Sequence, residues 1–207
     1  MKTHLETVEL LNRQSGEYEP AALYEGIDEK NLIDFEREWQ PLFASALPED
    51  ASAVERVAAG AEDANWDWRR LAEIGANPLA FGMYAVECAD KTQGLMLVRK
   101  GGAFSRHPDH ERADLIYIER LSTAPWNRPP MVDDPLYKGA GQILLAAAVN
   151  LSFDEELDGR IGLHSLPGAE TFYRDVIGMT DLAADTHHNG LQYFELSNAQ
   201  AAKFFAT

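Results

Sequence analysis

The feature that most constrains this chain is a strand, turn and helix unit that occurs twice in succession. The first unit joins an alternating stretch, Leu115–Thr123, through a glycine turn at Gly139–Gly141 to an Ala/Leu-rich segment, Gln142 to about Phe153. The second joins Arg160–Leu166 to Gly168–Ile177. Alternating apolar residues predict strands, and helical spacing predicts helices. Two such units in a row favour a sheet with helices packed on it.

Composition narrows the class of protein. The chain has 207 residues, of which 45% are hydrophobic and 25% charged, so we expect one globular domain over 1–207. The single cysteine, Cys88, excludes a disulfide framework. No apolar run is long enough to span a bilayer, and the start lacks the apolar core of a signal peptide. We expect a cytoplasmic protein without membrane association.

The formal net charge of −16 bears on partners. Nucleic-acid backbones should be repelled, because the sequence shows no basic patch. A cationic small molecule, such as a polyamine or an aminoglycoside, or a basic peptide would be attracted. We favour the simpler interpretation, that the acidity serves solubility or reflects a salt-tolerant source, because net charge says little about a specific site.

The first 77 residues are expected to form a helical N-terminal portion. The expected helices are Leu23–Phe43, Ala53–Ala59 and Glu62–Ile74. Pro41 should break or end the first, and Ser52 should cap the second. Met1–Leu10 alternates weakly and allows a strand, and Ser15–Glu19 reads as a loop.

Residues 78–197 are expected to form the core, and 198–207 a terminal helix capped by Asn198. Two hairpins are expected: Leu79–Glu87 with Gly94–Lys100, and Leu182–His188 with Leu191–Leu196 around Asn189–Gly190. His107 and His110 lie three apart in a polar loop, but no third ligand is near, so no metal site is predicted.

This order of elements resembles the GNAT acetyltransferase superfamily over roughly 79–196. In that family a Gln or Arg, two free positions, Gly, one free position and Gly or Ala follow the fourth strand. Here Leu136–Gly141 keeps both glycines but has Leu136 in the Gln/Arg place. The resemblance implies an α+β fold of three α/β layers, with a mixed central sheet whose fourth and fifth strands splay apart.

The resemblance also implies acetyl-CoA as cofactor. The pyrophosphate would bind at the glycine turn, through Lys138, Gly139, Ala140, Gly141 and Gln142. The pantetheine arm would pair with the backbone of the fourth strand, at Leu121, Ser122 and Thr123.

Catalytic roles follow from the same resemblance. Glu119 stands where some members carry a general base, and Tyr173 stands where many carry the acid that protonates the leaving thiolate. His164 is a second candidate for the base and could contact substrate. Trp126, in the proline-rich loop Pro125–Pro135, could line the acceptor pocket.

The leading prediction is an acetyl-CoA-dependent N-acetyltransferase that acts by direct transfer on a primary amine of a small molecule or peptide. One alternative is a non-catalytic GNAT-fold protein that binds CoA or a protein partner; Leu136 favours it, and the presence of Glu119 and Tyr173 opposes it. Another is an unrelated α+β interaction domain with an incidental glycine turn. The closing hairpin and terminal helix could also pair two chains as a homodimer.

Overall fold

The computed structural model describes residues 2–204, which fall into two compact units. Within the described residues, unit 1 comprises 2–76, Met83–Met96 and Leu121–Leu144, and unit 2 comprises Asn77–Gly82, Leu97–Arg120 and 145–204. The chain passes from one unit to the other between Ala76 and Asn77 and within strands β3, β4 and β5 and helix α5, whose bounds follow. The expected single domain stays a prediction.

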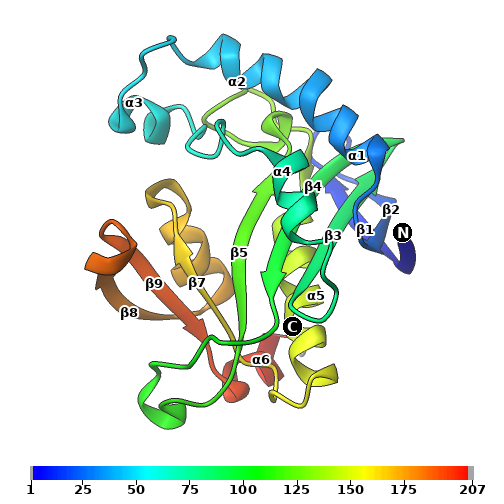
Figure 1. Ribbon diagram of the computed structural model, residues 1–207. Helices are drawn as coiled ribbons and strands as arrows, with labels where there is room; N and C mark the ends of the chain where they lie inside the picture. Colours follow the sequence, from blue (N-terminus) through cyan, green and yellow to red (C-terminus); the bar gives the residue numbers. More distant parts are fainter. Residues whose placement is uncertain (1, 205–207) are drawn as a thin grey trace. The chain divides into compact units, whose positions relative to one another are not determined.

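Unit 1 holds all or most of five strands in the order β6-β1-β2-β3-β4, where β3 begins in unit 2 and β4 continues into it. Figure 1 labels β1 to β4. The strands are β1 (Thr3–Asn12), β2 (Tyr18–Glu25), β3 (Phe81–Cys88), β4 (Lys91–Arg99) and β6 (Tyr137–Lys138). The strand pairs β6-β1, β1-β2 and β2-β3 are antiparallel. β3 and β4 are hydrogen-bonded neighbours in this order, so the predicted first hairpin is present.

The expectation of a helical N-terminal portion over 1–77 is wrong for its first 25 residues. The weak alternation near the start does form β1, but Tyr18–Glu25, predicted as loop and helix, is strand β2. Ala21 and Leu23 are buried with a period of two. β2 pairs with β1 on one side and β3 on the other, and such pairing overrides a local preference for helix.

Between β2 and β3, unit 1 has four α-helices, and a π turn joins the first two. The helices are α1 (Glu29–Asp34), α2 (Gln40–Ala46), α3 (Ala53–Ala58) and α4 (Trp68–Ile74), and the π turn is Phe35–Trp39. Pro41, predicted to break or end the helix, does not end it, because α2 continues past it, but the regular helix is interrupted by the π turn just before it. The Gln40 N–H already bonds five residues back, to Phe35, and this widened turn accommodates a residue that has no N–H.

Two helix starts show why boundaries shift. Ser52 caps α3 as predicted, and Glu55 completes a capping box. The helix expected from Glu62 begins only at Trp68, because the Asp67 side chain accepts the Arg70 N–H and fixes the N-cap there.

Unit 2 contains four strands in the order β5-β7-β9-β8, with β5 continuing into unit 1. They are β5 (Ile116–Thr123), β7 (Ile161–Ser165), β8 (Thr180–Asp185) and β9 (Leu191–Leu196). β5 and β7 are parallel, whereas β7-β9 and β8-β9 are antiparallel, so the sheet is mixed as predicted.

The predicted splay of the fourth and fifth strands is present between β5 and β7. Their pairing ends at Ile118 and Leu163, although β5 continues to Thr123. Helix α5 (Ala140–Asp154) begins two residues before the predicted start, because the Gly139 carbonyl accepts the Ile143 N–H.

The segment predicted as a regular helix over Gly168–Ile177 is irregular. A 3₁₀ turn at Pro167–Ala169 leads into a π turn at Phe172–Ile177. Tyr173 and Ile177 are buried as expected, but Val176 is 54% exposed. A π turn holds more residues than an α turn, so it rotates Val176 off the apolar face.

The closing hairpin is also modified. β8 ends at Asp185, and Thr186–His188 form a 3₁₀ turn before Asn189, which has φ 55°, and Gly190. Helix α6 (Asn198–Phe204) is capped by Ser197, which exchanges hydrogen bonds with Gln200, and not by Asn198. The predicted last helical residue, Phe205, lies outside the described residues. Within 2–204, no helix combines the length and apolar character needed to cross a membrane.

Candidate functional site

The strand register of unit 2 places four polar side chains on one face of its sheet. Tyr117 on β5 lies opposite Gly162 on β7, and His164 is two residues further on. Tyr193 on β9 pairs directly with His164. Asp185 pairs with Leu191, two residues from Tyr193. Side chains alternate between faces with a period of two, so this register brings the four together.

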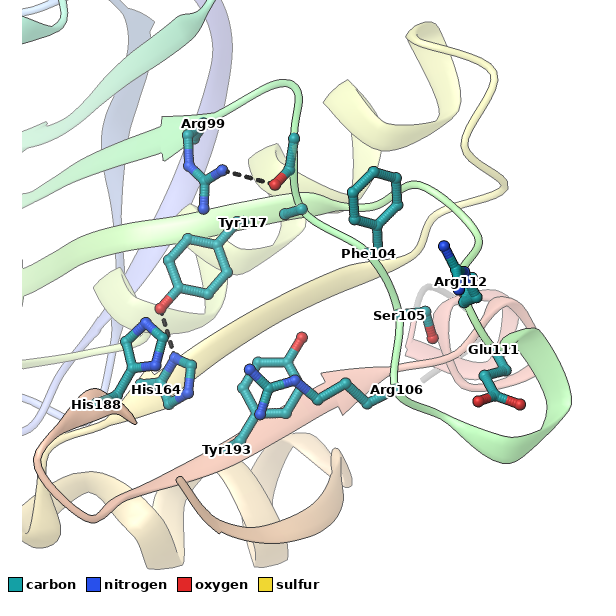
Figure 2. A pocket seen from close by; sticks show the side chains of 12 residues that line it. Arg99, Phe104, Ser105, Arg106, Glu111, Arg112, Tyr117, His164, His188 and Tyr193 are labelled. Atoms are coloured by element: carbon teal, nitrogen blue, oxygen red, sulfur yellow. Dashed lines mark hydrogen bonds between the residues drawn. The ribbon is translucent and has the colours of Figure 1, made fainter. Parts of the chain in front are cut away.

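Three of these side chains form a hydrogen-bonded chain, shown in part in Figure 2. The Tyr117 hydroxyl lies 2.6 Å from His164 Nδ1, and His164 Nε2 lies 3.0 Å from Asp185 Oδ2. The His164 and Asp185 side chains are only 4% and 5% exposed. A continuous series of hydrogen bonds therefore runs from a phenol through an imidazole to a carboxylate.

Of these three side chains, Asp185 makes the most hydrogen bonds. Its Oδ2 also lies 2.8 Å from the Arg106 guanidinium and 3.0 Å from His188 Nδ1, and Oδ1 accepts the His187 N–H. The Arg106 hydrogen bond, with those from the backbone and the imidazoles, holds the pKa of Asp185 well below its usual range. Asp185 is therefore a carboxylate at neutral pH.

The ionisation of its two partners follows. Burial lowers the pKa of the His164 imidazole, against the opposing effect of Asp185. Burial, followed by the nearby charge of Glu119, raises the pKa of Tyr117 to about 12. At neutral pH the phenol therefore keeps its proton and the imidazole is neutral.

A loop carries Arg106 to this site, and a buried carboxylate anchors the loop. Glu195 on β9 is 2% exposed and accepts hydrogen bonds from the Ser105 hydroxyl and from the N–H groups of Arg106 and His107. The Arg106 guanidinium lies 4.3 Å from the Tyr193 ring centroid. The segment around His107 and His110 is a loop, as predicted. Its first residues, Ser105–His107, are held in place by their hydrogen bonds to Glu195.

Tyr117, His164 and Tyr193 line a pocket of about 610 Å³, entirely within unit 2. Its volume is in the range of small-molecule sites. Aromatic and basic side chains dominate its wall: Tyr117, Tyr193, Phe104, His164, His188, Arg99, Arg106 and Arg112 (Figure 2).

Glu119, the predicted general base, lies two residues beyond Tyr117 on β5. Its Oε1 is 2.7 Å from Arg99 Nε, and the Glu119 side chain is 29% exposed. Arg99 is itself fixed by the carbonyls of Gly101 and Gly102, and its guanidinium lies 5.1 Å from the Tyr117 ring centroid. The charge of Glu119 on this strand is therefore balanced by Arg99.

Tyr173, the predicted acid, is 6% exposed and packs 6.0 Å from the Phe194 ring and 5.2 Å from Phe172. This is the packing role that its apolar helix face also predicts. His164, the second candidate, is by contrast part of the hydrogen-bonded chain at the pocket.

The residues predicted to bind pyrophosphate lie in unit 1. Lys138 is exposed at the end of β6, and Gly139 has φ +119°, a conformation that favours glycine. A Cβ on Gly139 would lie 3.3 Å from the Leu10 side chain. Ala140, Gly141 and Gln142 form the first turn of α5, where N–H groups lack partners inside the helix. Leu136, in the Gln/Arg place, is half-buried and supplies no charge.

The strand end predicted to hold pantetheine is fixed by Arg128. Its guanidinium bonds both oxygens of Asp63, at 2.6 and 2.7 Å, and also bonds the Ser122 hydroxyl and the Thr123 carbonyl. Ser122 in turn donates to Asp63. Leu121, Ser122 and Thr123 therefore belong to a rigid part of unit 1.

Trp126 is held by the proline-rich loop in unit 1. Its indole N–H donates to Gln93 at 2.9 Å, and its ring packs edge-on against Trp39, 6.2 Å away. The indole is half-buried, so its contribution to an acceptor pocket stays a prediction.

One cluster in unit 2 has the composition of a metal site. Single ligand atoms of His164, Asp185 and His188 lie within 4.8 Å of one another. The two imidazole rings stack 3.7 Å apart and both bond the same carboxylate oxygen, which Arg106 also bonds. Since a guanidinium already neutralises this carboxylate, the cluster gives no reason to revise the prediction of no metal.

The sequence reasoning missed Tyr117, Asp185, Arg99 and Arg106 as site residues. A signal for Tyr117 was available, because it shares a strand face with Glu119. For Asp185 and Arg106 no local signal exists, since only the pairing of β8 with β9 and the loop anchor at Glu195 bring them to the pocket.

No family model and no curated protein matches the sequence. Solved structures do match: the GNAT domain of S. lividans PAT aligns over 92% of this chain and 96% of its own, with 10% identity and a TM-score of 0.55. A protein of the yellow fever mosquito Aedes aegypti, provisionally named arylalkylamine N-acetyltransferase 7, aligns over 95% of both chains, with 12% identity and a TM-score of 0.53.

The chain has the GNAT fold. The mixed sheet of the prediction and the parted strands β5 and β7 agree with that conclusion. A Bacillus anthracis protein provisionally named a streptothricin acetyltransferase, in complex with acetyl coenzyme A, aligns over 56% of this chain and 62% of its own, with 16% identity and a TM-score of 0.42. This chain thus covers less than two thirds of that relative.

Proposed function

We propose that this protein transfers an acetyl group from acetyl-CoA to a primary amine of a small molecule or peptide. The observation that carries the proposal is the GNAT fold, shared with acetyltransferase domains over nearly the whole chain. A pocket in unit 2 with a hydrogen-bonded phenol, imidazole and carboxylate gives the fold an acid–base centre. We place this reaction in the cytoplasm, and the proposed homodimer would pair through the closing hairpin of β8 and β9 and through α6.

The acyl donor's pyrophosphate is assigned to the start of α5. Gly139 caps this 15-residue helix, so the N–H groups of its first turn and the helix dipole favour an anion. Lys138 adds a positive charge beside the turn, in place of the one that Leu136 does not supply. The pantetheine arm is assigned to the backbone of Leu121, Ser122 and Thr123, where Arg128 already bonds the Thr123 carbonyl.

Glu119 is assigned as the general base that removes the first proton from the substrate ammonium. The free amine then attacks the acetyl carbonyl directly. The partial exposure of Glu119 beside Arg99 supports its role as base, because the carboxylate is held in one position and reaches solvent. Tyr173 is assigned the proton returned to sulfur. Its burial against Phe194 supports the packing role instead, so Tyr173 is the weaker assignment.

The competing function is a GNAT-fold protein that binds CoA or a protein partner without catalysis. The observation in its favour is Leu136 in place of a Gln or Arg at the turn. This alternative leaves the polar chain from Tyr117 to Asp185 without a chemical task.

The test is to incubate the purified protein with acetyl-CoA and, in turn, putrescine, benzylamine and L-phenylalanine, which differ in charge. Free CoA thiol and acetylated product are measured together. We expect product with at least one amine, and a large loss of turnover in Glu119→Gln with unchanged acetyl-CoA affinity. Glu9→Gln, at an exposed glutamate of β1, is the matched control. Binding without product from any amine would favour the non-catalytic alternative.

A further inference from the structure

We propose that Tyr117, His164 and Asp185 form a proton relay in which the Tyr117 hydroxyl meets the substrate amine. This inference rests on the acetyl transfer proposed above. It adds Tyr117 as a catalytic residue, with His164 and Asp185 as positioning residues that act through it.

The direction of the hydrogen bonds follows from the chemistry of the groups. The Asp185 carboxylate can only accept, so His164 Nε2, 3.0 Å away, must carry the imidazole proton. His164 Nδ1 is then an acceptor, and at 2.6 Å it accepts the Tyr117 hydroxyl proton. The Nδ1 atom of the imidazole is thus placed to take the proton of the phenol. Asp185 would stabilise the imidazolium that results, as the carboxylate of a Ser-His-Asp triad does.

The contacts around Asp185 fix this geometry. Arg106, His164 and His188 all bond the same oxygen, Oδ2, while the His187 N–H holds the other. His188 stacks on His164 with ring centroids 3.7 Å apart and an interplanar angle of 13°. A side chain fixed on so many sides can hold the imidazole in one orientation, which a relay requires.

The proton balance of the proposed reaction leaves a task for this relay. The substrate ammonium first gives one proton to Glu119. When the nitrogen forms its bond to the acetyl carbon, it must lose a second proton, which passes to the Tyr117 oxygen while the phenol proton passes to His164 Nδ1. The carbon–sulfur bond breaks with its electron pair on sulfur, which takes a proton from the acid. One proton is released overall.

Tyr117 and Glu119 are suited to act on the same nitrogen in succession. They are two residues apart on one face of β5, and Arg99 contacts both, at 2.7 Å from Glu119 and 5.1 Å from the Tyr117 ring. The concerted transfer through Tyr117 never requires a free phenolate.

The experiment measures kcat, KM and acetyl-CoA affinity for Tyr117→Phe and His164→Gln beside the wild type. Tyr117→Phe keeps the ring and removes only the hydroxyl, and we expect a fall in kcat of roughly 100-fold or more with unchanged acetyl-CoA affinity. Tyr18→Phe, at a tyrosine of β2 that is 66% exposed, and His187→Gln, at an exposed histidine, are the matched controls.

Two further readouts separate a relay from a packing role. In nitrogen-15 NMR spectra, His164 should be neutral with its proton on Nε2, whether or not substrate is present. In the wild type, kcat/KM should fall as pH drops through the His164 pKa, which lies below the ordinary 6.5, because the base is then protonated. His164→Gln should lose this acid limb. The groups that face His164 are Tyr117, Asp185, His188, Tyr193 and, through Asp185, Arg106.

The outcomes distinguish the two proposals. Turnover of Tyr117→Phe within threefold of an active wild type would overturn the relay alone, as would a proton on His164 Nδ1. A wild type that forms no product with any of the three amines would overturn acetyl transfer and, with it, this role of the relay.

Discussion

Replacing Arg128 with Met should strongly destabilise unit 1. The Arg128 side chain is 14% exposed and the Asp63 side chain 5%, and two bonds of 2.6 and 2.7 Å join them. Arg128 also bonds the carbonyls of Gly60 and Thr123. Met keeps the apolar stem but leaves the Asp63 carboxylate with Ser122 as its remaining partner here.

The size of the effect follows from that burial. Removing one partner of a buried ion pair costs about 3–5 kcal/mol, because the other charge is left uncompensated. For a chain of this length, this corresponds to a fall in Tm of roughly 6–20 °C. It is also a large share of a typical stability of about 5–15 kcal/mol.

Urea unfolding of wild type, Arg128→Met, Asp63→Asn and the double variant provides the assay. The double variant should be more stable than the sum of the single losses implies, by at least about 1 kcal/mol, because the contacting partners are coupled. Arg69→Met removes exposed bridges to Glu29 and Glu36 and should shift the midpoint far less. An Arg128→Met midpoint equal to that of Arg69→Met would refute the reasoning.

Three further predictions test other parts of the structure. Gly94→Ala should cost about 1–3 kcal/mol, because its Cβ would lie 2.9 Å from the Leu144 side chain, whereas Gly101→Ala, with nothing within 4 Å, should unfold at the wild-type urea concentration. Because folding lowers the pKa of Asp185, the Asp185 carboxylate stabilises the fold above its unfolded pKa of about 3.9, and this stabilisation is lost as the pH falls further. Between pH 5 and pH 2 the urea midpoint of the wild type should therefore drop more than that of Asp185→Asn. Equal drops would contradict this. Burial raises the pKa of the Cys88 thiol, so a thiol reagent at neutral pH should label the native protein slowly and the unfolded protein completely, and rapid native labelling would show that Cys88 is accessible.

Periodicity and turn residues predicted the central elements of the fold. The alternation of Leu115–Thr123, the glycine turn and the apolar segment after it correspond to β5, Gly139 and α5. The strand β2 was missed because its residues favour helix locally, and only pairing on both sides makes them a strand. Neither π turn was predicted, because a search for a 3.6-residue period cannot reveal an inserted residue.

The candidate site could be predicted only in part. His164 lines the pocket and bonds Tyr117, and Glu119 bonds Arg99, another residue of the pocket wall, but the catalytic roles of both stay predictions. Asp185 could not be found from the sequence, because a change of register in β8 sets which residue faces β9 at its end. Tyr173 is buried, as the apolar spacing of its helix face predicts, and its role as the acid stays a prediction.

The measurement that tests the central claim most directly is calorimetric titration of the folded protein with acetyl-CoA, beside the same titration of Gly139→Glu. The variant places a bulky, negative side chain where φ is +119° and where the helix start is assigned to the pyrophosphate. The account predicts saturable binding by the wild type and none by a Gly139→Glu protein whose circular dichroism shows that it is folded. A folded wild type that does not bind acetyl-CoA would contradict the proposed acetyl transfer.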